Sequence, residues 1–216
     1  MDVVIKNTLA SFNPASAGWQ FMWILMIIGM AGVGICIERF YYILLKSSKG
    51  RDLFLARFAT LVKDKKFDEA IGFANQFENA KYPVASVMKA IVENRAKGKE
   101  GMIAASDSAF LMEAPRVNRY LALLGTFANV LTLTGLMGTI FGLIITFDAV
   151  ANKPAAERPA AMANGISVAM GTTLVALLGA IPIMGVQGFL LLISERVIQE
   201  MEEKGLTMIN HLATEA

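Results

Sequence analysis

Charged side chains are absent from three long stretches of the chain. These stretches are residues 21–37, 120–147 and 159–194. A bilayer core about 30 Å thick is crossed by roughly 20 apolar residues in an α-helix, and the second and third stretches exceed that length. The first is shorter, but aromatic side chains flank it, with Trp19 before it and Tyr41 after it, as at a membrane interface. The pattern predicts three transmembrane helices, over residues 19–44, 120–148 and 163–193.

The polar segment between the first two spans has the apolar spacing of α-helices. Apolar side chains, Phe54 and Phe58 among them, fall on one face of residues 52–62 with a period near 3.6. The Lys- and Gly-rich residues 97–101 predict a break, and residues 102–119 are expected to run on into the second span. About 70 residues in short helices make a thin core, so we expect this segment to pack against copies of itself or against extensions of the membrane helices.

Apolar positions also continue after the third span. Met201, Ile209 and Leu212 recur on one face of residues 194–212, so the third helix is expected to extend past the membrane with a seam for a partner helix. Residues 2–12 are apolar enough to lie flat on the outer membrane surface. The predicted fold is therefore all-α: a polytopic membrane protein with three transmembrane helices, long second and third helices that extend into the cytoplasm, and a helical cytoplasmic domain.

The distribution of basic residues sets the expected orientation. Of the 20 Lys and Arg residues, 14 lie between residues 46 and 119, and the positive-inside rule makes this segment cytoplasmic. A cleaved signal peptide is the competing interpretation of the N-terminus, but its basic region would be Lys6 alone. The predicted organisation in the inner membrane is a periplasmic segment 1–18, transmembrane helix 19–44, cytoplasmic helical domain 45–119, transmembrane helix 120–148, periplasmic loop 149–162, transmembrane helix 163–193 and cytoplasmic C-terminal helix 194–216.

Composition limits the kinds of functional site that the protein can contain. Hydrophobic residues make up 55% of the 216 residues, and the mean hydropathy of +0.52 suits a membrane protein. Cys36 is the one cysteine and His211 the one histidine, so the sequence offers no disulfide framework, no cysteine metal site and no catalytic pair. The net charge is +2 and the basic residues are dispersed, which argues against nucleic acid as a partner. We therefore expect no enzyme activity, no cofactor and no bound metal.

Small and hydroxyl-bearing residues form a stripe on each of the last two spans, at spacings of three and four that put them on one helical face. The second span carries Ala128, Thr132, Gly135, Thr139, Gly142 and Thr146, and the third carries Gly165, Ala169, Thr172, Ala176 and Gly179, with Thr173 beside them. One interpretation is close helix packing, with each threonine bonded to its own backbone. The other is a narrow polar path or a surface that holds a foreign helix, because hydroxyls can coordinate a cation or order water.

The absence of Asp, Glu, Lys, Arg and His from the interior of both long spans constrains the mechanism. Hydroxyl groups do not take up and release a proton at accessible pH, and an intramembrane carboxylate is the usual proton carrier. If the protein conducts ions, the titrating carboxylate must therefore come from another chain.

Charged residues gather at the ends of the spans. Asp148 is expected to be a helix-end residue or a group at an ion entrance. Glu38 and Arg39 are expected to form an interfacial pair. Contacts with neighbouring subunits or with lipid headgroups are expected of Glu113, Arg116 and Arg119.

Two motifs in the long spans resemble those of the MotA/TolQ/ExbB family. Residues 135–142, GLMGTIFG, resemble its GLxGTxxG motif, and residues 165–182, GISVAMGTTLVALLGAIP, resemble its GIxxALxTTxxGLxxAIP motif. Glu38-Arg39 resembles the Glu-Arg pair of that family, and the likeness covers roughly residues 20–200. Three spans, rather than the four of MotA, favour the ExbB/TolQ branch.

The resemblance implies a homopentamer whose second and third helices enclose a pore. In such complexes a partner similar to ExbD or TolR contributes a single membrane helix with an aspartate that carries the ion. The output is mechanical work on an envelope protein similar to TonB or TolA. TonB-type energisation of outer-membrane transport is the expected output, with Tol-type work or gliding motility as alternatives. A non-conducting membrane scaffold is the alternative from another class.

Transferred residue by residue, the resemblance selects Thr139 and Thr173. The set expected along the ion pathway is Thr139, Thr172, Thr173, Thr132 and Thr146, and the set expected to pack around the partner helix is Gly135, Gly142, Gly165, Ala169, Ala176 and Gly179. Two positions depart from the family: Val168 stands where many ExbB and TolQ chains have glutamate, and Thr132 where many have proline. Without that glutamate, ion coupling depends on the partner alone, and both protons and sodium remain open as the coupling ion.

Overall fold

The computed structural model describes residues 11–14, 17–42, 51–79 and 82–214, and every regular element among them is helical, which confirms the all-α prediction. The elements are α2 (Trp19–Phe40), α3 (Arg51–Lys63), α4 (Phe67–Asn79), α5 (Pro83–Glu93), the short 3-10 helix η2 (Arg95–Lys97), α6 (Gly98–Asn118), α7 (Leu121–Asn152) and α8 (Arg158–Thr214). Three helical stretches, which contain α2, α7 and α8, are long and apolar enough to cross a membrane. The surface helix predicted over residues 2–12 falls largely outside the described residues.

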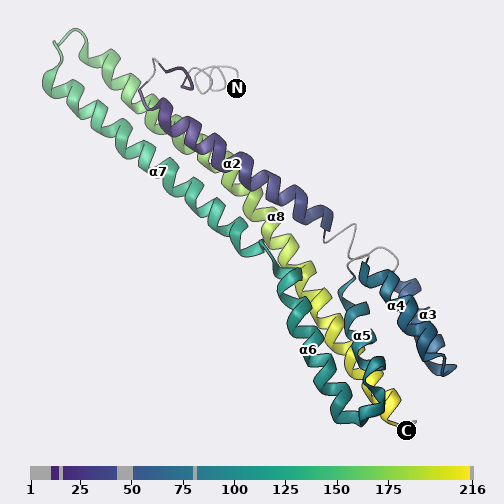
Figure 1. Ribbon diagram of the computed structural model, residues 1–216. Helices are drawn as coiled ribbons and strands as arrows, with labels where there is room; N and C mark the ends of the chain where they lie inside the picture. Colours follow the sequence, from purple (N-terminus) through teal and green to yellow (C-terminus); the bar gives the residue numbers. More distant parts are fainter. Residues whose placement is uncertain (1–10, 15–16, 43–50, 80–81, 215–216) are drawn as a thin grey trace. The chain divides into compact units, whose positions relative to one another are not determined.

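The chain folds as two compact units, and the first comprises residues 1–36 and 122–187. In this unit α2, α7 and the first part of α8 lie side by side (Figure 1). A Cβ atom on Gly32 of α2 would come within 2.6 Å of the Ile183 side chain of α8, so the two helices are in close contact. Phe21 and Phe141 join α2 to α7, with ring centroids 5.3 Å apart. The outward faces carry exposed Leu, Ile, Val and Met side chains, which suit contact with lipid tails.

The second unit comprises residues 37–121 and 188–216, and its core draws on α3, α4, α5, α6 and the last part of α8. Phe54 and Phe58 of α3 are fully buried, with ring centroids 5.2 Å apart. Met201 and Ile209 of α8 belong to the same core, so the seam expected after the third span packs within its own chain. The short helices alone would leave a thin core, and the end of α8 completes it.

The helix expected to run continuously from residue 102 into the second span is interrupted. α6 ends at Asn118 and α7 begins at Leu121, with Tyr120 between them in the left-handed region at φ 65°. A residue in that conformation ends a right-handed helix, and it is uncommon for a bulky side chain. The break expected at residues 97–101 starts slightly earlier, at η2, and Gly98 follows with φ 74°, a conformation that suits glycine.

The last helix is far longer than a membrane crossing requires. α8 contains 57 residues and is roughly 85 Å long at the usual rise per residue. A bilayer core is about 30 Å thick, so more than half of α8 lies outside any bilayer that its apolar part crosses.

Phe58→Ala is expected to lower the free energy of unfolding by about 3–5 kcal/mol, because it leaves a cavity in the core of the second unit. Phe58 is 0% exposed, whereas Leu53 on the same helix is 63% exposed. Leu53→Ala is therefore the matched control and should change stability by less than about 0.5 kcal/mol. Denaturant unfolding of the full chain in detergent measures both values. Equal unfolding curves for the two variants would contradict this assignment of the core.

Candidate functional site

Glycine lets the backbones of α7 and α8 approach closely. A Cβ atom on Gly142 would lie 2.6 Å from both the backbone N of Ala169 and the backbone O of Gly165. One on Gly135 would overlap Ala176, and one on Gly165 would overlap the Thr146 hydroxyl. Small residues at a helix–helix contact in membranes allow this approach. The two stripes found in the sequence therefore face each other within one chain.

This contact accounts for most of the residues expected to pack around a partner helix. Gly135, Gly142, Gly165, Ala169 and Ala176 all lie between α7 and α8. Gly179 of α8 has the Leu131 side chain 3.3 Å from the position of a Cβ atom. The structure thus gives these small residues a role in packing α7 on α8, and a second role against a partner helix stays a prediction.

Two of the five threonines are enclosed by the same contact. Thr172 is 1% exposed and lies against Gly138, and Thr146 is 7% exposed. The Thr146 hydroxyl donates to the carbonyl of Gly142 at 3.0 Å. The Thr172 hydroxyl lies 3.1 Å from the carbonyls of both Val168 and Ala169. Both side chains pack between the helices, and their role in lining an ion pathway stays a prediction.

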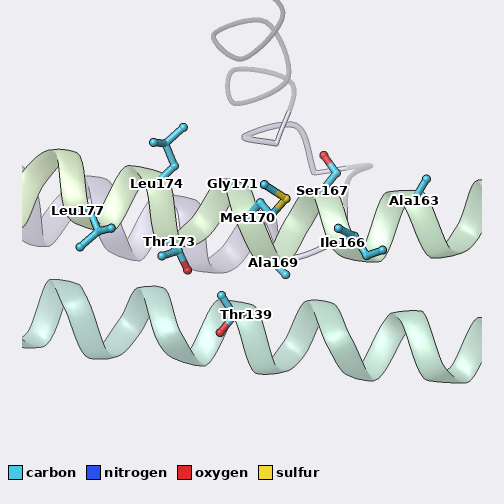
Figure 2. Close-up of a pocket in the computed structure, with 10 residues that line it drawn as sticks. All are labelled: Thr139, Ala163, Ile166, Ser167, Ala169, Met170, Gly171, Thr173, Leu174 and Leu177. Atoms are coloured by element: carbon cyan, nitrogen blue, oxygen red, sulfur yellow. The ribbon is translucent and has the colours of Figure 1, made fainter.

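Thr139 and Thr173 instead share a groove of about 980 Å³ on the surface of the first unit (Figure 2). Figure 2 shows Thr139 on α7 and Thr173 on the facing turn of α8, with the Thr173 side chain directed toward α7. The lining is Thr139, Ala163, Ile166, Ser167, Ala169, Met170, Gly171, Thr173, Leu174 and Leu177. These ten residues include no ionisable side chain, so the groove is apolar with three hydroxyl groups set in it.

The hydroxyl protons of both groove threonines are already engaged. Thr139 Oγ1 donates to the Leu136 carbonyl at 2.6 Å, on its own helix. Thr173 Oγ1 donates across to the Gly135 carbonyl of α7 at 3.4 Å. A hydroxyl has one proton and two lone pairs, so each of these oxygens can accept a further hydrogen bond or contact a cation. Thr132 donates in the same way to Ala128 at 3.0 Å, but it does not line the groove.

Most of the groove was not found from the sequence. Its α8 wall is a face formed by residues such as Ala163, Ser167 and Met170, next to the stripe of small residues rather than on it. That face is mostly apolar and is indistinguishable by composition from a lipid-facing surface. Thr173 was the one signal in the sequence that could have located this wall. Residues three, four and seven positions from it share its helical face, and several of them line the groove.

The two departures from the family pattern, Val168 and Thr132, are both absent from the lining of the groove. Val168 is 5% exposed, and its Cγ1 atom would be 2.7 Å from a Cβ atom on Gly18, so it packs toward the start of α2.

Asp148 is exposed near the end of α7, where its carboxylate accepts a hydrogen bond from Asn152 at 2.7 Å. Within the described residues, no group of three His, Cys, Asp or Glu side chains could hold a metal ion.

Comparison with known proteins shows which family the sequence resembles. The MotA/TolQ/ExbB proton channel family matches residues 79–203, more than half of the chain and including all of α7. A protein named as a biopolymer transport ExbB homologue of Methanothermobacter thermautotrophicus is 25% identical over 203 residues, which cover 94% of this chain and 70% of that protein. A biopolymer transport ExbB protein of Vibrio cholerae is 37% identical over 84 residues, which cover 39% of this chain and 36% of that protein.

This family is a channel family rather than an enzyme family. A channel is a membrane protein, and the part of the chain that the structure describes has three helices that are long and apolar enough to cross a membrane. On the strength of the family match and of relatives named ExbB, the chain belongs to the MotA/TolQ/ExbB proton channel family, in its ExbB-like branch.

Proposed function

We propose that this protein is the ExbB/TolQ-like subunit of an ion-driven motor complex in the inner membrane. The observation that carries the proposal is the pairing of Thr139 and Thr173 in one groove between two family-matched helices. The oxygen of each hydroxyl presents lone pairs, while its proton is held by a backbone carbonyl. Such oxygens suit contact with a cation or with ordered water, and the apolar walls suit an environment within a membrane.

The chemistry of the groove calls for a second protein. None of its lining side chains titrates, so it cannot take up a proton and release it. An ExbD/TolR-like partner with a single membrane helix supplies that group in this proposal, as an aspartate that approaches Thr139 and Thr173. The volume of about 980 Å³ and the mostly aliphatic lining fit one apolar face of such a helix.

In this proposal the assembly is a homopentamer, and each copy contributes its groove to the wall of a central pore. The N-terminus is periplasmic and the polar segment 45–119 is cytoplasmic, in keeping with its basic residues. The output is work on a TonB-like envelope protein, which energises outer-membrane transport. The relatives named as biopolymer transport proteins support this output over Tol-type or motility work.

Reconstitution of the full chain in liposomes tests the proposal. Proton flux at a fixed membrane potential, followed with a pH-sensitive dye, is expected only when a single-span partner with a membrane aspartate is also present. Replacing that aspartate with asparagine should reduce the flux at least tenfold, since the proton carrier is gone. Flux that is independent of the partner would contradict the proposal that the partner supplies the titrating carboxylate and this protein supplies the groove. A complex that assembles and never conducts would favour the scaffold.

The same liposomes identify the coupling ion. We expect flux that does not change when sodium is removed at a constant proton gradient, since the proton is the ion that a carboxylate carries by titration. A flux that stops without sodium would instead assign sodium as the coupling ion, with the threonine oxygens as its ligands.

A further inference from the structure

A second, strongly polar pocket lies in the other unit and plays no part in the proposed ion pathway. Its volume is about 550 Å³. Its walls come from the end of α2 and the residues after it, from the start of α5, and from the end of α6. The lining is Glu38, Arg39, Tyr42, Tyr82, Ser86, Glu113, Arg116, Arg119 and Tyr120.

The charges in this pocket leave an excess of one positive charge. Three guanidinium groups face two carboxylates, and both carboxylates are engaged within the wall. Glu38 forms an ion pair with Arg39 at 2.9 Å, and Glu113 forms one with Arg116 at 2.6 Å. Within the described residues, no carboxylate lies within ion-pair distance of Arg119. Among the residues that the structure describes, the pocket therefore offers one guanidinium, that of Arg119, whose charge is not balanced by an acid.

Aromatic rings hold two of these three guanidinium groups, those of Arg39 and Arg119, in place. The Arg39 side chain is 5% exposed, and its Cζ atom lies 5.0 Å from the ring centroid of Tyr42 and 4.9 Å from that of Tyr120. The Arg119 Cζ atom lies 4.6 Å from the centroid of Tyr120, and Arg119 donates to its hydroxyl at 2.5 Å. Stacking on rings orders guanidinium groups without neutralising them. Their N–H donors are thus arranged before any ligand arrives.

The position of the pocket along the chain indicates where its ligand comes from. Arg39 is the penultimate residue of α2, and Tyr120 immediately precedes α7. Both helices belong to stretches able to cross a membrane, so the pocket lies at the ends of two spans, where lipid headgroups are found. Arginine recognises phosphate oxygens with two parallel donors, and basic pockets at the ends of membrane helices bind anionic headgroups.

We propose that this pocket binds the phosphate group of an anionic membrane phospholipid. Arg119 is the principal donor to the phosphate, and Arg116 is the second. Glu113 and Ser86 position Arg116, since Glu113 Oε1 accepts from Arg116 and also from the Ser86 hydroxyl at 3.4 Å. The site is separate from the threonine groove and does not depend on the proposed ion coupling.

Native mass spectrometry of the full chain, purified in detergent and supplied with defined lipids, tests this site. Phosphatidylglycerol should remain bound at least tenfold more than phosphatidylcholine, whose headgroup carries no net charge. Arg119→Gln should reduce the retention of phosphatidylglycerol at least tenfold. Arg196→Gln is the matched control, because Arg196 is an exposed arginine of the same unit outside the pocket, and it should retain the lipid like the unchanged protein.

Further arms of the experiment separate the possible outcomes. Binding of inorganic phosphate without retention of phosphatidylglycerol would overturn the lipid assignment, and equal retention by Arg119→Gln and Arg196→Gln would overturn the site. If the Arg119→Gln protein does not fold, the Arg119→Lys variant tests the site instead, because lysine keeps the positive charge but lacks the two parallel donors of arginine. A threefold or greater loss of phosphatidylglycerol in Arg119→Lys supports the site, and full retention rejects it.

Discussion

Thr139→Val is expected to abolish ion-driven output while leaving the complex assembled. Valine has nearly the shape of threonine and the same β-branch, so the helix and the groove wall keep their form. The change removes one hydroxyl oxygen, which donates to the carbonyl of its own helix and otherwise faces the groove. Loss of that acceptor should lower ion flux, and the transport it energises, at least tenfold. Flux in liposomes and transport in cells measure the two effects.

Thr126→Val is the matched control for this change. Thr126 lies on the same helix and also donates to its own backbone, to the Ala122 carbonyl at 3.3 Å, but it is not part of the groove. It should retain full flux. Thr139→Ser, which restores the oxygen, should recover most of the activity. Full output from Thr139→Val would contradict the motor function and favour a scaffold, whereas loss of assembly would make Thr139 a packing residue.

Gly142→Ala is expected to destabilise the contact between α7 and α8 by about 1–3 kcal/mol. The added methyl group would lie 2.6 Å from the backbone of Ala169 and of Gly165, and backbone atoms cannot rotate away as a flexible side chain can. The helices must separate, and Thr173 would then lose its hydrogen bond to the Gly135 carbonyl. Both the unfolding temperature in detergent and the ion flux should therefore fall.

Gly185→Ala provides the comparison, because a Cβ atom on Gly185 of α8 would meet no described atom within 4 Å beyond its chain neighbours and the nearby backbone of its own helix. Alanine is favoured over glycine inside a helix by roughly 0.5–1 kcal/mol, so this variant should be as stable as the unchanged protein or more so. If Gly142→Ala and Gly185→Ala unfold at the same temperature, the close approach of α7 and α8 described for Gly142 is wrong.

The spans and the stripes could be predicted from the sequence, because both are properties of spacing along one helix. Which stripe residue faces which neighbour could not. Thr172 and Thr173 are adjacent in sequence, and a helix turns by about 100° between them. That rotation puts Thr172 inside the contact with α7 at 1% exposure, while Thr173 opens into the groove. Only the position of α7 distinguishes the two residues.

The break before α7 was missed for a different reason. The two residues at the break, Arg119 and Tyr120, are neither glycine nor proline. The nearest proline, Pro115, lies within α6 and does not end it. The left-handed conformation of Tyr120 brings no local sequence signal, because its ring contacts a distant residue as well as the neighbouring Arg119. The ring lies against the guanidinium of Arg39, about 80 positions earlier in the sequence.

The donated protons of Thr139 and Thr173 give the groove a polarity of its own. Each hydroxyl donates its hydrogen to a backbone carbonyl, which leaves the lone pairs of its oxygen to accept from another group. Water molecules beside these side chains would orient their hydrogens toward the wall. A cation would meet partial negative charge there, and an anion would meet repulsion. If ions pass along the groove as proposed, it would discriminate between them by the sign of their charge, although none of its ten lining residues is itself charged.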